Sequence, residues 1–311
     1  MVEALVTGRV AVDLYPEQLE RPLEEVETYR RYAGGFAANV ATGLARLGVS
    51  AAVFSAVGDD GHGRFLRSFL DGEGIDCTWL GIHPTLRTAL AFCEIWRPDR
   101  FPITFYRTPT CPDWEVRPDD IDLELVSAVP LLYLSGTALA REPSRTTMVA
   151  LAEARGREGT TTILDLDWRP SLWGGAAEYA SELRRVLPAA TTILGGHAEW
   201  AAAGLDPGGN RSATCVVKHG AEGVTVHGRD GGTRSEPGRA VSVVNGLGAG
   251  DAFAAGWGYG LLRGRDPASV ANAAGAIVAG RHSCSTAMPR LEELESCLSG
   301  EEYARSGGSP G

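Results

Sequence analysis

The stretch Asn245-Gly246-Leu247-Gly248-Ala249-Gly250-Asp251 joins two contrasting patterns late in a chain of 311 residues. The residues before it, 241–244, are β-branched or small and predict a short buried strand. After it, apolar residues recur at helical spacing from Asp251, and Gly264 is typical of a helix end. Because three glycines free the backbone for a sharp turn, the sequence predicts a strand, a turn and a helix in direct succession.

This turn predicts an anion site beside a base. The first amides of a helix lack internal partners and lie at the positive end of its dipole, so those of Gly248, Ala249 and Gly250 are expected to converge on an anion. Asp251 would repel bound phosphate, so we interpret it as a base that takes a proton from a hydroxyl while the amides stabilise a transferring phosphoryl group. A structural alternative stays open, because glycines allow close packing and Asp is a common helix cap.

The same residues resemble the Asp-Thr-x-Gly-Ala-Gly-Asp signature of the ribokinase-like (PfkB) sugar kinases. Asn245 departs from that signature and, with the Gly-Ala-Gly-Asp-Ala-Phe that follows, resembles the branch of 5-dehydro-2-deoxygluconokinases of inositol breakdown. The resemblance extends from Gly8 to Pro289. It implies an α/β, ribokinase-like fold: a doubly wound, mostly parallel sheet flanked by helices, with a small β-sheet lid.

The resemblance also implies an activity. It is that of an ATP-dependent kinase that transfers the γ-phosphoryl group to the terminal hydroxyl of a sugar acid, 5-dehydro-2-deoxy-D-gluconate. ATP and Mg²⁺ are implied as cofactors, and many relatives bind a monovalent cation such as K⁺ near a region matching 282–289. A kinase acting on 2-keto-3-deoxygluconate or fructose remains an alternative. So does a noncatalytic sensor of sugar or nucleotide, although the retained Asp251 argues against it.

Composition narrows the class of protein. Hydrophobic residues make up 44% of the chain and charged residues 22%, as in ordinary folded proteins. The net charge of −10 argues against nucleic acid as a partner, since nucleic-acid binding needs a basic face. No apolar run approaches the roughly 20 residues that span a bilayer, and the first residues lack the basic region of a signal peptide. The six cysteines lack zinc-site or disulfide spacing, so we expect a cytoplasmic protein with small-molecule partners and no membrane partner.

Strand and helix patterns alternate without repeats or an obvious linker. We therefore expect a single kinase domain over residues 1–299, with lid segments at about 14–33 and 87–108 according to the resemblance. Residues 300–311 are rich in Gly, Ser and charge and are expected to be disordered. An exposed edge of the lid sheet would make a homodimer plausible.

Candidate sugar-binding residues come from the first strand and helix. The strand pattern Leu5–Asp13 ends in a carboxylate, and ligands gather at strand ends in such sheets, although Asp13 could simply form a turn. Gly34 and Gly35 precede a small-residue helix and match the family's Gly-Gly-x-x-x-Asn element. The resemblance therefore implies that Asp13, Gly35 and Asn39 hold the sugar.

Two arginines are candidates for the carboxylate of an acidic substrate. Arg107 follows the strand pattern at 103–107, and its planar fork suits a carboxylate, although a surface ion pair explains it equally well. Arg169 follows a strand at 161–166 within Asp165-Leu166-Asp167-Trp168-Arg169-Pro170, which resembles the family's Asp-x-Asn/Asp-x-Arg element. Structural pairing of these carboxylates with the arginine stays open.

The nucleotide candidates lie in the second half of the chain. Lys218, Gly220 and Gly223 resemble the family's Lys-x-Gly-x-x-Gly nucleotide element. Lys218 could also be a structural lysine in an ion pair, whereas Gly220 would bring the backbone close to ATP. The resemblance also assigns Asn245 and Gly246, at the start of the glycine turn, to the nucleotide site.

Metal binding is expected at Asp165 and Glu199. Most relatives carry Asn-x-x-Glu where this chain has Gly196 and Glu199, with the Glu helping to organise water around Mg²⁺. Because Gly196 replaces the Asn, a water molecule or His197 would have to substitute for it in the handling of magnesium or phosphate.

Overall fold

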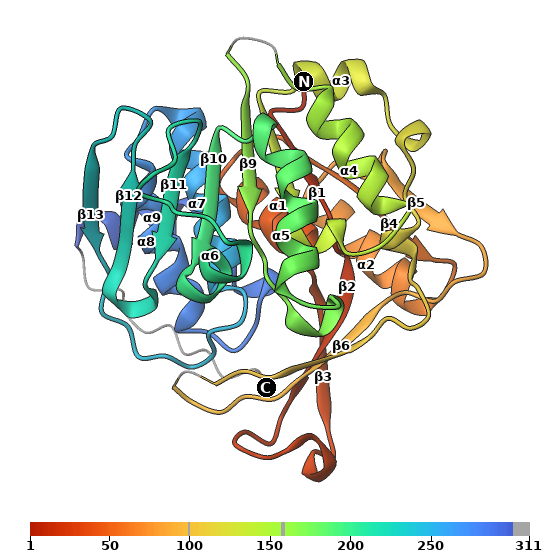
Figure 1. Ribbon diagram of the computed structural model, residues 1–311. Coiled ribbons are helices and arrows are strands. Elements are labelled where there is room, and N and C mark those ends of the chain that lie inside the picture. The colour runs from red at the N-terminus through yellow and green to blue at the C-terminus, as the bar shows by residue number, and fades with distance from the viewer. Residues whose placement is uncertain (99, 157–158, 301–311) are drawn as a thin grey trace.

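The computed structural model describes residues 1–98, 100–156 and 159–300, and the expected tail at 301–311 lies outside these ranges. Within them, a central sheet consists of β1 (Ala4–Thr7), β4 (Ala51–Gly58), β5 (Leu80–His83), β8 (Leu131–Ser135), β9 (Thr161–Asp165), β10 (Thr192–Gly196), β11 (Thr214–Lys218), β12 (Gly223–His227) and β13 (Thr233–Pro237). The spatial order is β13-β12-β11-β10-β9-β8-β1-β4-β5 (Figure 1). The neighbouring strands are parallel from β11 to β5, and β12 and β13 are added as an antiparallel hairpin.

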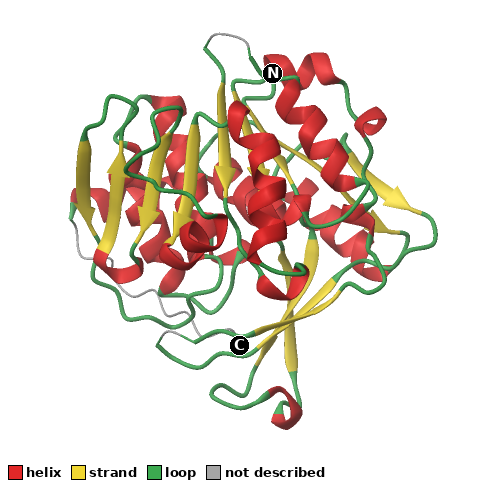
Figure 2. Cartoon of the chain, in the orientation of Figure 1, coloured by secondary structure: helices red, strands yellow, loops and turns green. Residues whose placement is uncertain are grey.

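Helices cover both faces of this sheet (Figure 2). They are α1 (Phe36–Arg46), α2 (Gly61–Gly72), α3 (Leu123–Ala128), α4 (Ser144–Glu153), α5 (Ala176–Val186), α6 (His197–Ala203), α7 (Ala249–Arg263), α8 (Pro267–Ala279) and α9 (Leu291–Ser299). Successive residues of a strand point to opposite faces, so Val6 joins the core beneath α1, α7 and α8, while Leu5 joins the core beneath α4, α5 and α6. The predicted doubly wound, mostly parallel α/β fold is confirmed.

A second, small sheet projects from one end of the large sheet (Figure 2). Its strands are β2 (Ala11–Pro16), β3 (Tyr29–Gly34), β6 (Leu90–Cys93) and β7 (Ile103–Tyr106), in the order β3-β2-β6-β7. The continuous strand predicted for Leu5–Asp13 is wrong, because the chain leaves the large sheet after Thr7 and enters the small one at Ala11. Gly8 makes this break possible, since its φ of 117° is a conformation that other residues rarely adopt.

The strand predicted at 241–244 is also absent. This segment runs outside both sheets, and the amides of Val244 and Asn245 donate to the carbonyl of Ala279 on α8. Val241 and Val243 line a cavity instead of pairing with a strand. The helix that follows, α7, begins at Ala249, and Gly264 ends it with a φ of 63°, as the sequence predicts.

Among the residues that the structure describes, none of the helices is both long and apolar enough to cross a membrane.

Candidate active site

The first turn of α7 lies between two cavities. Gly248 and Asp251 line the charged pocket, which also contains Arg9, Asp13 and other polar side chains. Gly246, Ala249 and Gly250 line the apolar pocket, which lies beside α8. One glycine turn therefore belongs to two sites, which is the arrangement that transfer of a group from one ligand to another needs.

Asp251 is held in the charged pocket by Asn39 of α1. The Nδ2 of Asn39 donates to Oδ2 of Asp251 at 2.7 Å, and its Oδ1 accepts a hydrogen bond from Oγ of Ser285 at 2.6 Å. Burial and the neighbouring charge of Asp167 raise the pKa of Asp251, and the hydrogen bond from Asn39 opposes that rise. The carboxyl group is therefore both oriented and made a better proton acceptor than an exposed aspartate.

Asp13 enters the same pocket from β2. The Gly34–Gly35 pair makes room for it, because a Cβ on Gly34 would lie 2.1 Å from the Asp13 carboxyl and one on Gly35 would lie 2.5 Å from the carbonyl oxygen of Arg9. The thiol of Cys284 lies 3.4 Å from Oδ2 of Asp13. Burial raises the pKa of Asp13 to about 6, so this carboxyl group titrates near neutral pH.

Two guanidinium groups, those of Arg9 and Arg169, line the charged pocket and share one carboxylate. Nη2 of Arg9 lies 2.8 Å from Oδ2 of Asp167, and Nε of Arg169 lies 3.1 Å from its Oδ1 but is not aligned for a hydrogen bond. Thr137 Oγ1 accepts from Nε of Arg9 and donates to Asp167. Burial alone would raise the pKa of Asp167, but the two arginines and Thr137 hold it well below its usual range.

Asp167 also has an unusual backbone. Its φ of 37° lies in the left-handed region, which non-glycine residues seldom adopt. Such strain concentrates at functional sites, where surrounding contacts fix it. Here the fixed backbone places one carboxylate between Arg9 and Arg169.

Arg107 does not line the charged pocket, and its expected contact with the substrate carboxylate stays a prediction. Its Nη2 forms a short ion pair with Asp113, and its guanidinium carbon lies 4.2 Å from the ring centroid of Trp114. Asp113 is itself buried, and its Oδ2 accepts from the amide of Val10. Arg107 directly follows β7, which is the edge strand of the small sheet.

The glycine turn is shaped by tight packing. Gly248 has a φ of 83°, and a Cβ there would lie 2.9 Å from Cβ of Cys284. A Cβ on Gly246 would lie 2.6 Å from the ring of Phe101, which follows β6. Asn245 is fully buried; its Oδ1 accepts from the amide of Leu247, and it does not line the apolar pocket. Asn245 thus shapes the turn, and its expected role at the nucleotide site stays a prediction.

The amides of the turn are not all free. The amide of Ala249 donates to the carbonyl of Gly246 at 3.3 Å, a long contact within the turn. Among the described residues, no hydrogen-bond acceptor pairs with the amides of Gly248 and Gly250. These two amides lie at the start of a 15-residue helix and are the ones available to an anion.

Lys218, at the end of β11, lies between the two residues predicted to bind metal. Its Nζ is 3.2 Å from Oδ2 of Asp165 and 3.8 Å from Oε2 of Glu199. Burial raises the pKa of Asp165, and Lys218 offsets this only in part because Glu199, Asp167 and Asp251 add negative charge. The same carboxylates keep Lys218 charged by raising its pKa.

The metal prediction fits the structure only in a limited form. Glu199 Oε2 already accepts from the amide of Gly196 at 2.5 Å, at the start of α6. Across the described parts of the chain, no three histidine, cysteine or carboxylate side chains gather closely enough to hold a metal. Asp165 and Glu199 therefore suit a magnesium ion that brings phosphate and water ligands with it.

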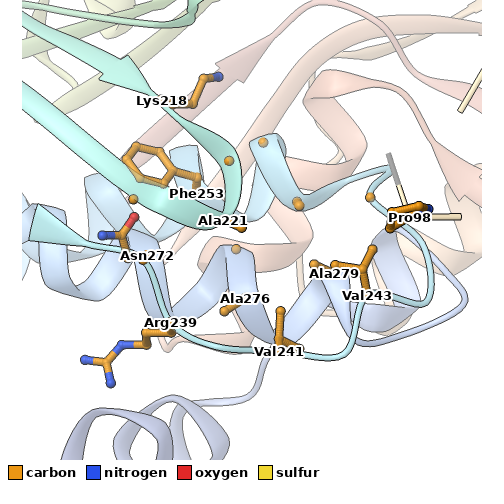
Figure 3. A pocket seen from close by; sticks show the side chains of 17 residues that line it. Pro98, Lys218, Ala221, Arg239, Val241, Val243, Phe253, Asn272, Ala276 and Ala279 are labelled. Atoms are coloured by element: carbon orange, nitrogen blue, oxygen red, sulfur yellow. The ribbon is translucent and has the colours of Figure 1, made fainter. Parts of the chain in front are cut away.

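The apolar pocket has a volume of about 460 Å³ and is lined mostly by small residues (Figure 3). Lys218, Gly220 and Gly223, the residues expected at the nucleotide site, border it. Ala276 and Ala279 of α8 form an apolar wall with Val241 and Val243. A flat aromatic group with a phosphate chain directed to the start of α7 fits this lining.

Sequence reasoning missed several residues of both pockets. Arg9, Ser285 and Cys284 lie in matched segments, but nothing in their spacing indicated that they meet Asp251 or Asp13. Asn272 on α8 lines the apolar pocket and donates to the carbonyls of Glu236 and Pro237. A small-residue helix with a single amide side chain was the one available signal for it.

Comparisons with known proteins agree with this geometry. The description "pfkB family carbohydrate kinase" matches residues 1–291. A protein of Geobacillus kaustophilus named 5-dehydro-2-deoxygluconokinase is 33% identical over 311 residues, covering 94% of this chain and 92% of that protein. The protein of the same name from Bacillus velezensis is 31% identical, covering 94% and 93%.

Solved structures are similar over almost the whole chain. Fructokinase from Vibrio cholerae, crystallised with fructose, ADP and calcium, superposes with a TM-score of 0.84 at 26% identity, covering 96% of this chain and 99% of that one. A ribokinase-type protein from E. coli has a TM-score of 0.86 at 19% identity, covering 97% and 100%. On this evidence and that of the two pockets, the chain belongs to the pfkB family of carbohydrate kinases and is a phosphotransferase that acts on a sugar hydroxyl.

Proposed function

We propose that this enzyme transfers the γ-phosphoryl group of ATP to the terminal hydroxyl of a sugar acid, 5-dehydro-2-deoxy-D-gluconate. The observation that carries the proposal is the turn at the start of α7, which lines the charged pocket through Asp251 and the apolar pocket through Gly250. The acid is chosen because relatives about 30% identical over nearly their full length bear that name. Two arginines in the charged pocket support an anionic acceptor.

Asp251 acts as the general base in this proposal. The acceptor hydroxyl enters beside it, and the carboxylate takes the proton as the oxygen attacks phosphorus. Asn39 keeps the carboxylate pointed at the pocket through the hydrogen bond at 2.7 Å. The raised pKa of Asp251 makes it a stronger base than an exposed aspartate.

The charge of the transferring group is stabilised by the amides of Gly248 and Gly250 and by Lys218. Catalysis of phosphoryl transfer rests mostly on positioning and on such fixed positive groups. Nζ of Lys218 lies 3.8 Å from where a Cβ of Gly250 would stand, so its ammonium group is close to the free amides. Ala249 contributes mainly its backbone conformation, because its amide is already bonded.

Arg9 and Arg169 bind the carboxylate of the acceptor, and Asp13 and Gly35 contact its hydroxyl groups. Asp167 positions both guanidinium groups through its two oxygens. A fixed guanidinium fork recognises a carboxylate by two parallel hydrogen bonds. Arg107 is left out of this set because its partners are Asp113 and Trp114.

ATP occupies the apolar pocket, with its base against α8 and its phosphates toward Lys218. Neighbouring structures contain ATP, ADP, calcium or potassium, which supports a nucleotide and a metal in general. Magnesium, held by Asp165 and Glu199 through water and the phosphates, would supply neutralising charge. A potassium ion near 282–289 remains part of the proposal.

The small sheet serves as a lid. The charged pocket has a volume of only about 40 Å³, which holds a few water molecules but no six-carbon acid. The acceptor can therefore enter only if the small sheet moves outward, and closure would exclude the water that otherwise hydrolyses ATP.

A homodimer through the small sheet belongs to the same proposal. Tyr29, Phe92 and Tyr106 form an aromatic row across this sheet, with ring centroids 5.2 and 5.1 Å apart, and Tyr106 is 59% exposed. Light scattering of the wild type and of Tyr106→Glu tests this, with a dimer expected only for the wild type. A monomeric wild type at micromolar concentration would refute the dimer and leave the kinase proposal untouched.

The deciding experiment for the substrate is a phosphorylation assay with three acceptors. They are 5-dehydro-2-deoxy-D-gluconate, 2-keto-3-deoxygluconate and fructose, each with ATP and Mg²⁺. The highest kcat/KM is expected for the first, and replacement Arg9→Met should lower it far more for the acids than for fructose. Equal loss for all three acceptors, or a preference for fructose in the wild type, would overturn the choice of an acid.

A further inference from the structure

Two histidine side chains, those of His197 and His219, meet at one end of the large sheet and are called the histidine pair below. Strands β10 and β11 are parallel neighbours (Figure 1), and Gly196 lies opposite Lys218 at their carboxyl ends. Each histidine is the next residue along its own segment, so the register of the sheet brings the two rings together. Neither ring lines the charged or the apolar pocket, and neither has a role in the proposed reaction.

The ring nitrogens of the histidine pair converge. Nε2 of His197 lies 2.7 Å from Nδ1 of His219, and the ring centroids are 4.7 Å apart. A single proton therefore stands between two atoms that can both bind a metal. Within the described ranges, the rings form no hydrogen bond or ion pair with a charged side chain, and Thr225 is their one other hydrogen-bond partner.

Thr225 of β12 supplies the second observation. Its Oγ1 lies 2.8 Å from Nε2 of His219 and 3.3 Å from Oγ of Ser235. When the hydroxyl proton of Thr225 is directed to Ser235, its oxygen accepts from Nε2–H of His219, and Nδ1 of that ring keeps its lone pair toward His197. Histidine ligands of metals almost always donate their second ring nitrogen to an acceptor in this way, which fixes the tautomer and the orientation of the ring.

The backbone of the histidine pair is fixed on both sides. The amide of His219 donates to the carbonyl of Gly223 at 2.8 Å, and Glu199 accepts from the amide of Gly196, the residue before His197. Two ligands held by a folded sheet lose little conformational freedom when an ion binds, whereas the unfolded chain has no such site. The carboxylate of Glu199 also offsets the partial positive charge at the start of α6, which would otherwise disfavour a cation.

Imidazole nitrogens select the class of ion. They suit Zn²⁺, Ni²⁺ and Cu²⁺, whereas Mg²⁺ prefers oxygen ligands. Zinc–nitrogen bonds of about 2.0–2.1 Å at a tetrahedral centre place two nitrogens about 3.3 Å apart, so the rings need to separate by only about 0.6 Å. We propose that the histidine pair binds one Zn²⁺ ion, or another divalent ion of the same class, at a site distinct from the magnesium ligands Asp165 and Glu199.

The proposed ion joins the start of α6 to the end of β11. No third histidine, cysteine or carboxylate side chain completes the group in the part of the chain that the structure describes, so water fills the remaining positions of the ion. An ion that binds the folded chain and not the unfolded one raises Tm as its concentration rises. The site therefore acts as a metal clasp between two neighbouring segments of the sheet edge.

The test uses the full chain without a histidine tag, with Mg²⁺ in excess so that the carboxylate ligands are occupied. Binding of Zn²⁺, and in a separate arm of Ni²⁺, is measured by titration calorimetry, and Tm is measured with and without each ion. His197→Gln and His219→Gln each remove one ligand, and His197 is exposed, so its replacement should not disturb folding. His227→Gln on β12 is the matched control, because the ring of His227 bonds to Thr233 instead of a second histidine.

One ion per chain is expected for the wild type and for His227→Gln, with binding about ten-fold or more weaker in each variant of the histidine pair. The rise in Tm should disappear in the same two variants. Wild-type binding by His197→Gln, or no saturable binding of either ion at submillimolar concentration, overturns the inference. Loss of the bound ion as Mg²⁺ is raised also overturns it, because the ion would then lie on Asp165 and Glu199. None of these measurements involves turnover, so they are separable from a failure of the proposed kinase reaction.

Discussion

The charged pocket and the apolar pocket meet at one turn but are built in opposite ways. The charged pocket is made of ionisable and polar side chains from segments far apart in the sequence, among them β2, α1 and α7, that hold one another in place. The apolar pocket is lined mostly by glycines, alanines and valines, and Lys218, Arg239 and Asn272 are its charged and polar side chains. If the pockets bind acceptor and nucleotide as proposed, acceptor recognition depends on a network of distant side chains, whereas nucleotide binding depends on how closely the backbone can approach.

The largest expected effect comes from removing the base at the junction of the two pockets. Asp251→Asn should lower kcat by about 10²–10⁴, because the amide cannot accept the hydroxyl proton. The KM for ATP should change little, since Asp251 does not line the apolar pocket. Steady-state kinetics measure both, with the exposed Asp59→Asn as control. Near-normal turnover of Asp251→Asn would show that the two pockets do not share this base.

The next prediction concerns the free energy of unfolding, which should depend on pH through Asp13 of the charged pocket. Asp13 has a folded-state pKa of about 6 against an ordinary 3.8, so the native state holds its proton to higher pH than the unfolded state. The contribution of Asp13 to the free energy of unfolding is therefore fully present below about pH 4 and is lost as the pH rises through 6. For a pKa difference of about two units, this contribution is at most about 3 kcal/mol. Asp13→Asn removes this loss.

Urea unfolding at pH 4 and pH 8 measures this difference. Relative to the wild type, Asp13→Asn should be more stable at pH 8 than at pH 4 by up to about 3 kcal/mol, while losing acceptor binding. The exposed Asp59→Asn serves as the matched control. If the difference in free energy of unfolding between Asp13→Asn and the wild type does not change with pH, the wild-type Asp13 carboxyl group is not desolvated.

The apolar pocket should respond to volume instead of charge. Ala276→Phe fills the wall that faces the proposed base of ATP, and overpacking of this kind costs about 1–3 kcal/mol. The KM for ATP should rise by about 5–100-fold, with a much smaller change in acceptor KM. Ala198→Phe, at an exposed position of α6, serves as the size-matched control. An unchanged ATP KM for Ala276→Phe would place the nucleotide elsewhere.

The smallest expected effect is on the pKa of Asp251. Asn39→Ala removes a hydrogen bond that favours the ionised carboxylate, so the pKa of Asp251 should rise further. The acidic limb of kcat/KM against pH should then move upward by up to about one unit, the worth of one hydrogen bond. Ser285→Ala, which removes the bond to Asn39 alone, should move it less. A downward shift would contradict the assigned role of Asn39.

The two pockets were also unequally predictable from the sequence. Gly220 and Gly223 mark the apolar pocket, and their φ values of 62° and 103° show why glycine was informative there. Local backbone demands leave a local signal. The valines at 241–244 led to a wrong prediction of a strand, because their β-branched pattern is the same whether they pair in a sheet or line a cavity.

The contacts of the charged pocket left no such signal. Asn39 and Asp251 are 212 positions apart, and Arg9 and Asp167 are 158 apart. Asn39 was predicted to hold the sugar, which stays a prediction, and the structure shows that it donates a hydrogen bond to the carboxylate of Asp251. Arg9 was overlooked, because no local pattern indicated that it would meet Asp167. Arg107 was predicted to bind the acceptor carboxylate, and the structure pairs it with Asp113.

The sequence by itself determined the alternation of strands and helices, the glycine turn before α7 and the presence of an acid at its start, because these follow from backbone freedom and side-chain periodicity over a few residues. Only the tertiary structure decided which charges meet, since pKa values and pairing depend on burial and on neighbours that the folded sheet brings together. The local sequence of the glycine turn indicates where a phosphoryl group can be bound, whereas the tertiary structure brings together the side chains proposed to bind the acceptor.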